Sequence, residues 1–304
     1  MSNRSSAEDS QSVPERAASP WVGLSYVAVA VLFFSTTPVL IRYSSPLTPC
    51  EIAFGRLCVA SVVVGLMAAG SGLSLTYTID GCRKFALYGL ITALHFLLYI
   101  ASLSFTSITH SLSLVYTAPI FVTLFSAIAL KEDLPRVKYL GIGVAIVGVT
   151  ILARFEPTMN PTMLLGDALA IGSAVCFGLY SVAGRAERQS YPLLRYAFAV
   201  YSFAAAWLLP FALVWHHSGP PVWGLDARPL IAVAALGVFP LAIGHTLYNA
   251  SLRRVHATYV NLVATQEVTG GVLLGLVFLG EVPSVTSVIG AAITLLGVFL
   301  VLRS

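Results

Sequence analysis

The sequence predicts an all-α integral membrane protein with ten transmembrane helices, arranged as two inverted five-helix repeats. The first reason is composition, because 57% of the 304 residues are hydrophobic and only 10% are charged, whereas a soluble domain carries about 25% charged residues. The second reason is segment length. Apolar stretches of about 20 residues recur along the chain, and each is long enough to cross a bilayer core of about 30 Å.

The third reason is an internal repeat. Four residues of the first half recur 149 positions later, namely Tyr99, Ala101, Ser102 and Leu103 as Tyr248, Ala250, Ser251 and Leu252. The same register pairs Glu132 with Glu281, Gly141 with Gly290 and Gly148 with Gly297. Nearer the start the offset is 143, which pairs Phe34, Val39 and Arg42 with Phe177, Val182 and Arg185. Because each half holds an odd number of helices, the second half is expected to enter the bilayer with the opposite orientation.

The apolar segments and the polar loops between them give the order of the elements. The predicted spans are 22–42, 50–70, 85–104, 108–130, 136–153, 164–185, 192–215, 229–251, 257–280 and 284–302. Residues 1–21 hold Ser, Glu, Arg and Pro and are expected to form a disordered cytoplasmic tail. The first apolar stretch lacks a small-residue cleavage site, so we expect no cleaved signal peptide. The predicted organisation is therefore this tail, a first repeat over 22–153 and a second over 164–302.

Basic residues predict the orientation, because Lys and Arg near the ends of spanning helices stay on the cytoplasmic side. With the N-terminus inside, thirteen of the 17 basic residues lie on the inner side and three on the outer side. Both termini are therefore expected in the cytoplasm. The formal net charge of +4 then reflects loops that face anionic lipid, and it gives no reason to invoke nucleic acid.

Polar residues inside the spans of the first half are candidates for function. In the first helix, Ser35 to Pro38 are expected to interrupt the helix. Arg56 lies about seven residues into the second helix, where it could bind a substrate carboxylate or an ion-pair partner, or else anchor at the interface. The third helix carries one polar stripe, formed by Thr92, His95, Tyr99 and Ser102. Tyr116 and Thr117 follow in the fourth helix, and the fifth is rich in glycine.

The second half repeats this pattern with different residues. Asp167 lies in the first turn of the sixth helix, where a carboxylate complements the helix dipole. The eighth helix offers His245, Tyr248, Asn249 and Ser251, and the ninth offers Asn261, Thr265 and Gln266. These groups are expected either to line a cavity or to join helices by hydrogen bonds. The glycine-rich fifth and tenth helices are expected to pack against each other or against a second protomer.

Glu267 is the sharpest candidate, because it lies about eleven residues into the ninth helix and hence near the bilayer midplane. A carboxylate there costs about 2.5 kcal/mol or more, so such groups usually face a partner or a wet cavity. Glu267 is predicted to accept a proton or to bind a cationic substrate group. The alternative is a protonated glutamate bonded to a neighbouring helix. Glu132 and Glu281, each followed closely by a proline, are interpreted as caps of the next helices.

Several chemistries have no support in the sequence. Cys50, Cys58, Cys82 and Cys176 have neither disulfide-like nor zinc-like spacing. We find no phosphate-binding Walker loop, zinc-protease helix or nucleophile elbow. The prediction is therefore a non-enzyme with no cofactor and no metal.

The chain resembles an EamA-type member of the drug/metabolite transporter superfamily over nearly its whole length. The resemblance rests on two five-helix halves, on Pro119, on the Lys131-Glu132 and Gly280-Glu281 pairs, and on the glycine-rich fifth and tenth helices. It implies ten helices, cytoplasmic termini and a central cavity lined mainly by the third, fourth, eighth and ninth helices. The chain departs from the family at one place, because Glu267 is followed by Val268 where the family often has proline.

The resemblance implies a secondary transporter of the bacterial inner membrane that exports a small polar metabolite by alternating access. An amino acid or an amino-acid-derived compound, metallophore-type products included, is the expected substrate. The candidate substrate-binding or coupling residues are Glu267, Arg56, His95, Tyr99, Tyr116, His245, Tyr248, Asn249, Asn261 and Gln266. The expected partners are this metabolite, the lipid bilayer and protons as a coupling ion, with a homodimer left open. The alternatives are an importer of a vitamin or nucleobase, and a membrane-embedded sensor or enzyme.

Overall fold

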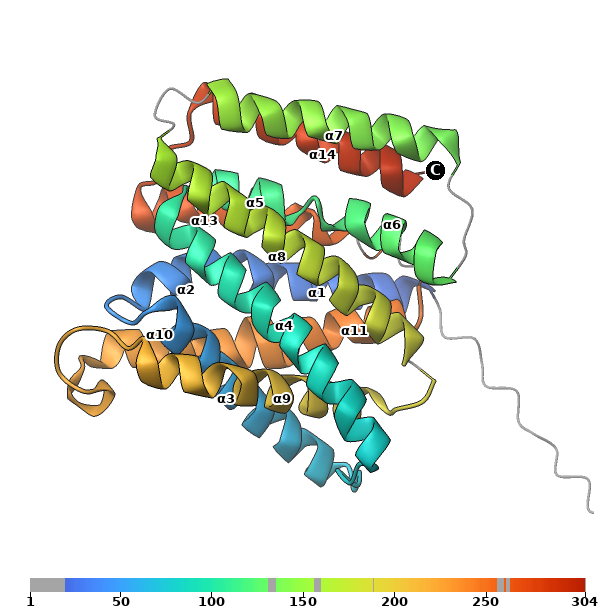
Figure 1. The fold of residues 1–304 in the computed structure, drawn as a ribbon, viewed down its shortest axis with the longest axis vertical. Coiled ribbons are helices and arrows are strands. Elements are labelled where there is room, and N and C mark those ends of the chain that lie inside the picture. The colour runs from blue at the N-terminus through green and yellow to red at the C-terminus, as the bar shows by residue number, and fades with distance from the viewer. Residues whose placement is uncertain are drawn as a thin grey trace, which may run out of the picture.

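The computed structural model describes residues 20–130, 135–155, 160–187, 189–255, 260 and 263–303, and every regular element in these ranges is a helix (Figure 1). The first half contains α1 (Pro20–Ser35), α2 (Thr37–Tyr43), α3 (Pro49–Gly70), α4 (Ile79–Phe105), α5 (Ile108–Val115), α6 (Ala118–Leu130) and α7 (Arg136–Phe155). The second half contains α8 (Pro161–Ala186), α9 (Leu193–Val214), the 3₁₀ turn η1 (Val222–Gly224), α10 (Ala227–Leu236), the π-helical η2 (Gly237–His245), α11 (Thr246–Leu252), α13 (Gln266–Leu279) and α14 (Val285–Arg303).

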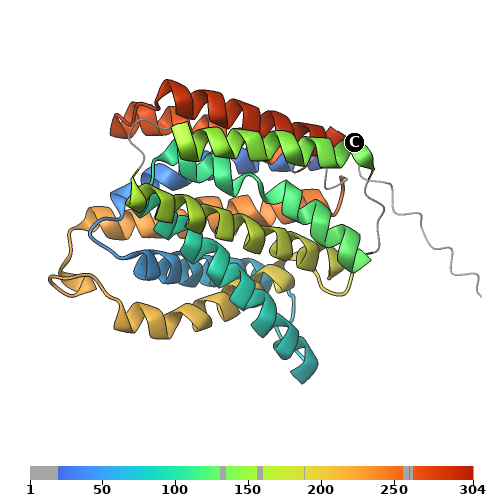
Figure 2. The same ribbon diagram turned by 45° about the horizontal axis from the view of Figure 1, so that its top comes forward.

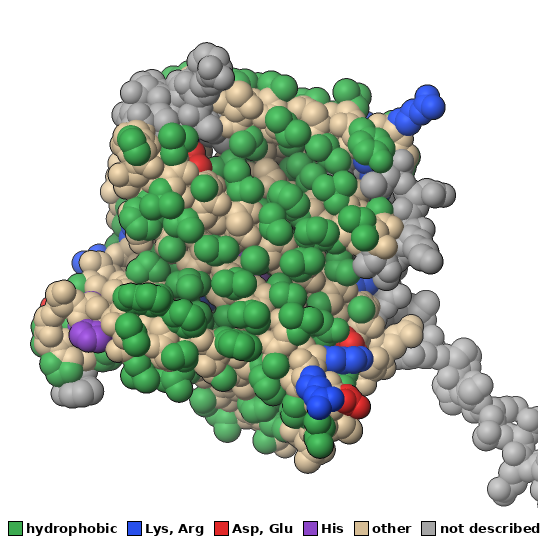
Figure 3. All heavy atoms as spheres, in the orientation of Figure 1, with side chains coloured by type: hydrophobic (Ala, Val, Ile, Leu, Met, Phe, Trp, Pro, Cys, Tyr) green, Lys and Arg blue, Asp and Glu red, His purple; other side chains and the backbone are tan. Residues whose placement is uncertain are grey.

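The helices have the length and composition of membrane spans. Seven stretches in the described ranges are long and apolar enough to cross a bilayer, namely Trp21–Tyr43, Pro49–Gly70, Ile79–Phe105, Ile108–Phe125, Pro161–Ala186, Leu193–Val214 and Ala227–Leu252. Gln266–Leu279 and Val285–Leu300 are shorter apolar helices. Figure 3 shows hydrophobic side chains over most of one face, with charged groups near its margins. The chain is therefore a multi-pass membrane protein, as the composition predicted.

Helix starts follow local capping rules, and they explain where the observed ends differ from the predicted ones. The third span begins at Ile79, before the predicted residue 85, because the Thr78 side chain accepts a hydrogen bond from the Gly81 amide. Thr48 and Glu51 form a reciprocal capping box at the start of α3. Such a cap stabilises a helix by about 1 kcal/mol.

Two predicted helices are broken in the structure. The first span is divided at Thr36, between α1 and α2, as the Ser35–Pro38 segment predicted. The predicted fourth helix is divided at Tyr116 and Thr117, where α5 ends and α6 begins. Of the predicted ninth helix, residues 257–259 and 261–262 lie outside the described ranges, and α13 begins at Gln266.

The centre of the bundle is built around α4. This helix packs against α8 and α9, while α3 packs against α9 and η2, and α1 packs against η2, α11 and α13. The predicted polar stripe of α4 is buried among these helices, at Thr92, His95, Tyr99 and Ser102. The stripe therefore faces the protein and not lipid, as expected.

Helices α7 and α14 form a pair at one edge of the bundle (Figures 1 and 2). Gly148 of α7 lies against Thr294 and Gly290 of α14, too close for a Cβ atom. Gly297 of α14 lies equally close to Ala145 and Gly141 of α7. The prediction that the glycine-rich helices pack against each other is confirmed.

The glycine contacts of this pair are reciprocal, since the 149-residue offset converts one contact into the other. Two further contacts at glycines have the same property. Gly23 lies against Val255, and the repeat-related Gly166 lies against the repeat-related Thr106. Gly270 lies against Ser35, and the corresponding positions, Phe121 and Gly178, also meet. The same packing contacts thus recur in both halves of the chain.

Candidate functional site

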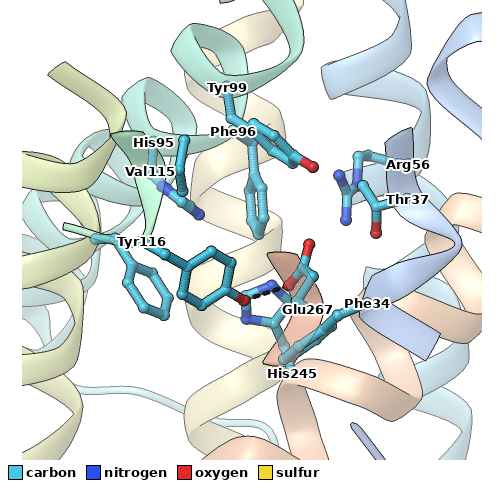
Figure 4. Close-up of a pocket in the computed structure, with 11 residues that line it drawn as sticks. Phe34, Thr37, Arg56, His95, Phe96, Tyr99, Val115, Tyr116, His245 and Glu267 are labelled. Atoms are coloured by element: carbon cyan, nitrogen blue, oxygen red, sulfur yellow. Dashed lines mark hydrogen bonds between the residues drawn. The ribbon is translucent and has the colours of Figure 1, made fainter. Parts of the chain in front are cut away.

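A cavity lies at the centre of the bundle, where the broken helices meet. The space between atoms there measures about 450 Å³, a volume that includes the part open to solvent. The lining residues are Phe34, Thr37, Arg56, His95, Phe96, Tyr99, Val115, Tyr116, Phe177, His245 and Glu267 (Figure 4). They come from α1, α2, α3, α4, α5, α8, η2, α13 and the junction between α5 and α6.

The helix breaks place three of these residues at the ends of helical segments. Thr37 follows the break between α1 and α2, Tyr116 lies in the break between α5 and α6, and Glu267 lies in the first turn of α13. Pro38 and Pro119 explain the first two breaks, because proline removes a backbone donor and clashes with the preceding turn. The start of α13 requires no proline, so the missing family proline after Glu267 does not produce a continuous helix. Discontinuous helices at mid-membrane level are typical of substrate sites in transporters.

Glu267 and Tyr116 join the two halves of the chain across the cavity. The Tyr116 hydroxyl donates a hydrogen bond to the Glu267 Oε2 atom (Figure 4). Both side chains are buried. A hydrogen bond to a charged group contributes about 1.5–3 kcal/mol, so this phenol offsets part of the cost of a carboxylate at this depth.

Arg56 is the second charged residue of the cavity, and it is only 1% exposed. Its Nε and Nη1 atoms are buried without a hydrogen-bond partner among the described residues. The guanidinium carbon lies 4.6 Å from the centre of the Phe96 ring, and a cation–π contact of this kind contributes about 0.5–2 kcal/mol. Because an arginine cannot lose its proton, this contact alone leaves much of the desolvation cost of the charge uncompensated.

Aromatic rings and two imidazoles form the rest of the wall. The His245 ring lies 4.7 Å from the Phe34 ring and 5.2 Å from the Phe96 ring, measured between centroids. The His95 ring lies 4.9 Å from the Phe177 ring. His95 Nδ1 is 3.1 Å from the Ser173 carbonyl oxygen, so this imidazole is held in place by α8. In the described part of the chain no three His, Cys, Asp or Glu side chains gather as metal ligands would.

The structure brings together six of the ten candidate residues, namely Arg56, His95, Tyr99, Tyr116, His245 and Glu267. Three others lie outside the lining. Tyr248 is buried beside Phe34 and Phe177, while the Asn249 amide donates to the Tyr180 hydroxyl and the His245 carbonyl. Gln266 is exposed, because α13 turns its Glu267 face inward. The tenth, Asn261, lies outside the described residues.

Five lining residues were not among the candidates, namely Phe34, Thr37, Phe96, Val115 and Phe177. The internal repeat relates four residues of the cavity wall to one another in pairs. Phe34 and Phe177 are repeat-related at the offset of 143, and Phe96 and His245 are repeat-related at 149. Positions that the repeat equates thus meet in one cavity even where the residue type has changed.

An ion pair joins the helices at one end of the cavity region. Arg42, at the end of α2, contacts Glu281 after α13, with Nη2 2.9 Å from Oε1. Its guanidinium also donates to the carbonyls of Leu103 and Thr106 at the end of α4. The other Glu281 oxygen accepts a hydrogen bond from the Ile108 amide at the start of α5, over 3.1 Å. These contacts therefore join the end of α2, the residue after α13, the end of α4 and the start of α5.

This arrangement corrects the interpretation of Glu281 as a cap of the following helix. The α14 start is served by Ser284, whose hydroxyl accepts from the Ser287 amide. Glu281 instead caps α5, which belongs to the other half of the chain. Glu132, its repeat counterpart, lies outside the described residues.

Comparison with known proteins agrees with this architecture. The model of the EamA-like transporter family matches residues 21–154 and 164–303, which is most of the sequence. The chain belongs to this family. This EamA-like protein is 25% identical over 279 residues to the pseudopaline exporter CntI of Pseudomonas aeruginosa, which covers 89% of the chain and 92% of that relative.

A second relative and a solved structure extend the comparison. The EamA-like chain is 28% identical over 259 residues to a probable terminal-alkyne amino-acid exporter of Streptantibioticus cattleyicolor, covering 83% of each protein. A crystal structure with 20% identity superposes with a TM-score of 0.65 and covers 91% of this chain and 95% of its own. The relatives are named as exporters, and the solved structure supports the fold.

Proposed function

We propose that this EamA-like protein is a secondary active exporter of a small polar metabolite in the bacterial inner membrane. The observation that carries the proposal is the central cavity, which is lined by a buried arginine of α3 and by a buried glutamate at a helix break. Intramembrane charges of this kind usually mark a substrate or ion pathway. Relatives named for the export of pseudopaline and of an amino acid favour an amino acid or an amino-acid-derived substrate, metallophore-type products included.

Transport proceeds in this proposal by alternating access between two inverted halves, residues 22–153 and 164–302, with both termini in the cytoplasm. The reciprocal contacts of Gly148 and Gly297 support it, since a twofold axis in the membrane plane would produce them. The basic residues on the predicted inner side support the orientation. Exchanging the conformations of the two halves would open the same cavity to the opposite side.

Glu267 is the proposed proton acceptor of the cycle. It is the carboxylate that lines the cavity, and Tyr116 bonds it from the other half of the chain. Protonation would weaken that bond and so couple a proton to the relative position of the halves. Glu267→Gln is expected to transport without dependence on a pH gradient, whereas unchanged pH dependence would remove this role.

The first experiment is counterflow in liposomes that hold the purified full-length protein. The probes are radiolabelled amino acids, amino-acid-derived metallophores, nucleobases and vitamins. Exchange with an amino acid or a derivative, absent from protein-free liposomes, is the expected result. Folded and inserted protein that exchanges none of the amino-acid probes would contradict the proposed substrate.

The aromatic wall favours one competing function. Phe34, Phe96 and Phe177 could stack on a flat ligand, as an importer of a vitamin or nucleobase would require. The same counterflow panel separates the two functions by substrate. Vesicles of both orientations then separate export from import.

A further inference from the structure

We propose that the cavity binds a zwitterion, with the ligand carboxylate on Arg56 and the ligand ammonium on Glu267. The proposal rests on the proposed transport function and names the ligand chemistry of the same cavity. Its starting point is that two opposite charges line one buried cavity without forming an ion pair with each other.

Arg56 requires an anionic partner. Arg56 is only 1% exposed. Its buried Nε and Nη1 atoms have no hydrogen-bond partner among the described residues. A guanidinium presents parallel donors that match the two oxygens of a carboxylate. The hydroxyl of Tyr99, also buried and without a partner in the described ranges, points toward Arg56 (Figure 4). A ligand carboxylate would therefore satisfy donors on both α3 and α4.

Glu267 supplies the opposite charge a short way across the cavity. Figure 4 shows its carboxylate facing the Arg56 guanidinium, while its dashed hydrogen bond runs to Tyr116. Tyr116 uses one carboxylate oxygen and leaves the other available to a cation. An ammonium group has donors and no acceptors, so it suits this oxygen and is repelled by Arg56.

The presence of two opposite charges in one cavity, unpaired within the described residues, selects the ligand. Opposite charges that are buried together attract, yet Tyr116 holds Glu267 on one side and Phe96 lies beneath the Arg56 guanidinium on the other. A molecule carrying only a carboxylate would satisfy Arg56 and leave Glu267 facing a second negative group. A molecule with both charges satisfies each residue. The α-amino acid head group, with its two charges two bonds apart, carries one group for each residue.

The rest of the cavity indicates what else the ligand carries. Phe34, Phe177 and the two imidazoles present ring surfaces. His245 adds a buried Nδ1 atom that has no partner among the described residues. The remainder of the ligand is therefore expected to be apolar or aromatic, with one polar atom that bonds His245 Nδ1.

The test is equilibrium binding to the purified full-length protein in nanodiscs, with radiolabelled L-phenylalanine and L-histidine as probes. Two modified forms of each probe remove one charge at a time: the amide lacks the carboxylate and the N-acetyl derivative lacks the ammonium. Wild-type protein is expected to bind each modified form at least tenfold more weakly, which equals about 1.4 kcal/mol. Arg56→Gln should abolish the preference over the amide, and Glu267→Gln the preference over the N-acetyl form.

Matched variants keep the test independent of folding. Arg195→Gln removes a guanidinium that lies over Tyr77 and Tyr191, outside the cavity, and should retain both preferences. Arg56→Lys retains the charge and should keep the preference over the amide with weaker binding. Because the comparison of each amino acid with its two modified forms uses wild-type protein alone, it decides the matter even where a variant does not fold.

Three outcomes of the binding assay would overturn the proposal. They are no binding of either amino acid, equal binding of an amino acid and its charge-deleted forms, and an unchanged amide preference in folded Arg56→Gln. Binding with the expected preferences but without flux in liposomes would overturn the transport function and leave the zwitterion site standing. Flux of a metabolite that lacks one of the two charges would overturn the zwitterion site and leave the transport function.

Discussion

Loss of the Arg42–Glu281 ion pair is expected to open one end of the cavity. The pair joins α2 to α13, and both side chains are about 30% exposed (30% and 29%). A partly exposed ion pair contributes about 1 kcal/mol, which corresponds to a shift of about fivefold in an equilibrium constant. Glu281→Gln removes the charge and keeps an acceptor for the Ile108 amide. The ratio of open to closed forms should therefore rise about fivefold.

The assay is the rate at which a cavity cysteine reacts with a membrane-impermeant maleimide. Thr37→Cys places the thiol in the cavity lining, where the native side chain is 3% exposed, and Cys50, Cys58, Cys82 and Cys176, which are free in the structure, are first replaced by serine. Vesicles of both orientations are labelled, and the rate should increase from one side only.

A charge exchange and a control complete the design. Arg42→Glu combined with Glu281→Arg should restore part of the slow labelling. Asp80→Asn, which breaks the exposed pair with Arg83 at the opposite end of α4, should leave the rate unchanged. Equal rates for wild type and Glu281→Gln from both sides would refute the role of this ion pair in closing the cavity.

Three further predictions concern other parts of the molecule. Tyr116→Phe removes the hydrogen bond to Glu267 and should lower counterflow about tenfold if that bond contributes about 1.5 kcal/mol, whereas Tyr139→Phe on the exposed face of α7 should not. Gly148→Leu forces a side chain against α14 and should destabilise the protein by about 1–3 kcal/mol in thermal unfolding, while Gly143→Leu, with open space around it, should be neutral. Glu51 and the Pro220 carbonyl raise the pKa of His217, so the stability contributed by protonated His217 is complete at low pH and lost as pH rises through that raised pKa. The Tm difference between wild type and His217→Gln should accordingly be larger at about pH 5.5 than at about pH 8.5, and a difference independent of pH would contradict the reasoning.

The membrane helices and the frame they form could be predicted from the sequence because both depend on local patterns. Apolar length predicted the spans, Ser35 to Pro38 predicted the break in the first one, and glycine content predicted the α7–α14 contact. Each of these signals can be read within a single segment, although the glycine contact itself joins two helices. The cavity could be predicted in part, since Arg56 and Glu267 stand out in any apolar segment.

Helical phase explains what the sequence did not predict. Gln266 and Glu267 are adjacent, and a residue step turns an α-helix by about 100°, so the start of α13 decides which of them faces inward. Tyr248 and Asn249 follow the π-helical η2, which winds more residues into each turn and displaces the faces of the residues after it. The Tyr116–Glu267 bond joins residues 151 positions apart, and no local pattern indicates such a pairing.

If the chain works by the proposed alternating access, its reciprocal glycine contacts have a consequence for the energies of the two access states. If a perfect twofold axis related the two halves, the inward-open and outward-open conformations would have the same energy. Neither conformation would then be preferred at rest. The charges of the cavity break this degeneracy. Glu267 corresponds to Ala118 in the first half, and no residue from Ala199 to Ala205, where a counterpart of Arg56 would fall, is charged. In the proposed alternating-access cycle, the preference for one access state at rest is therefore expected to depend on positions such as these, where the two halves differ.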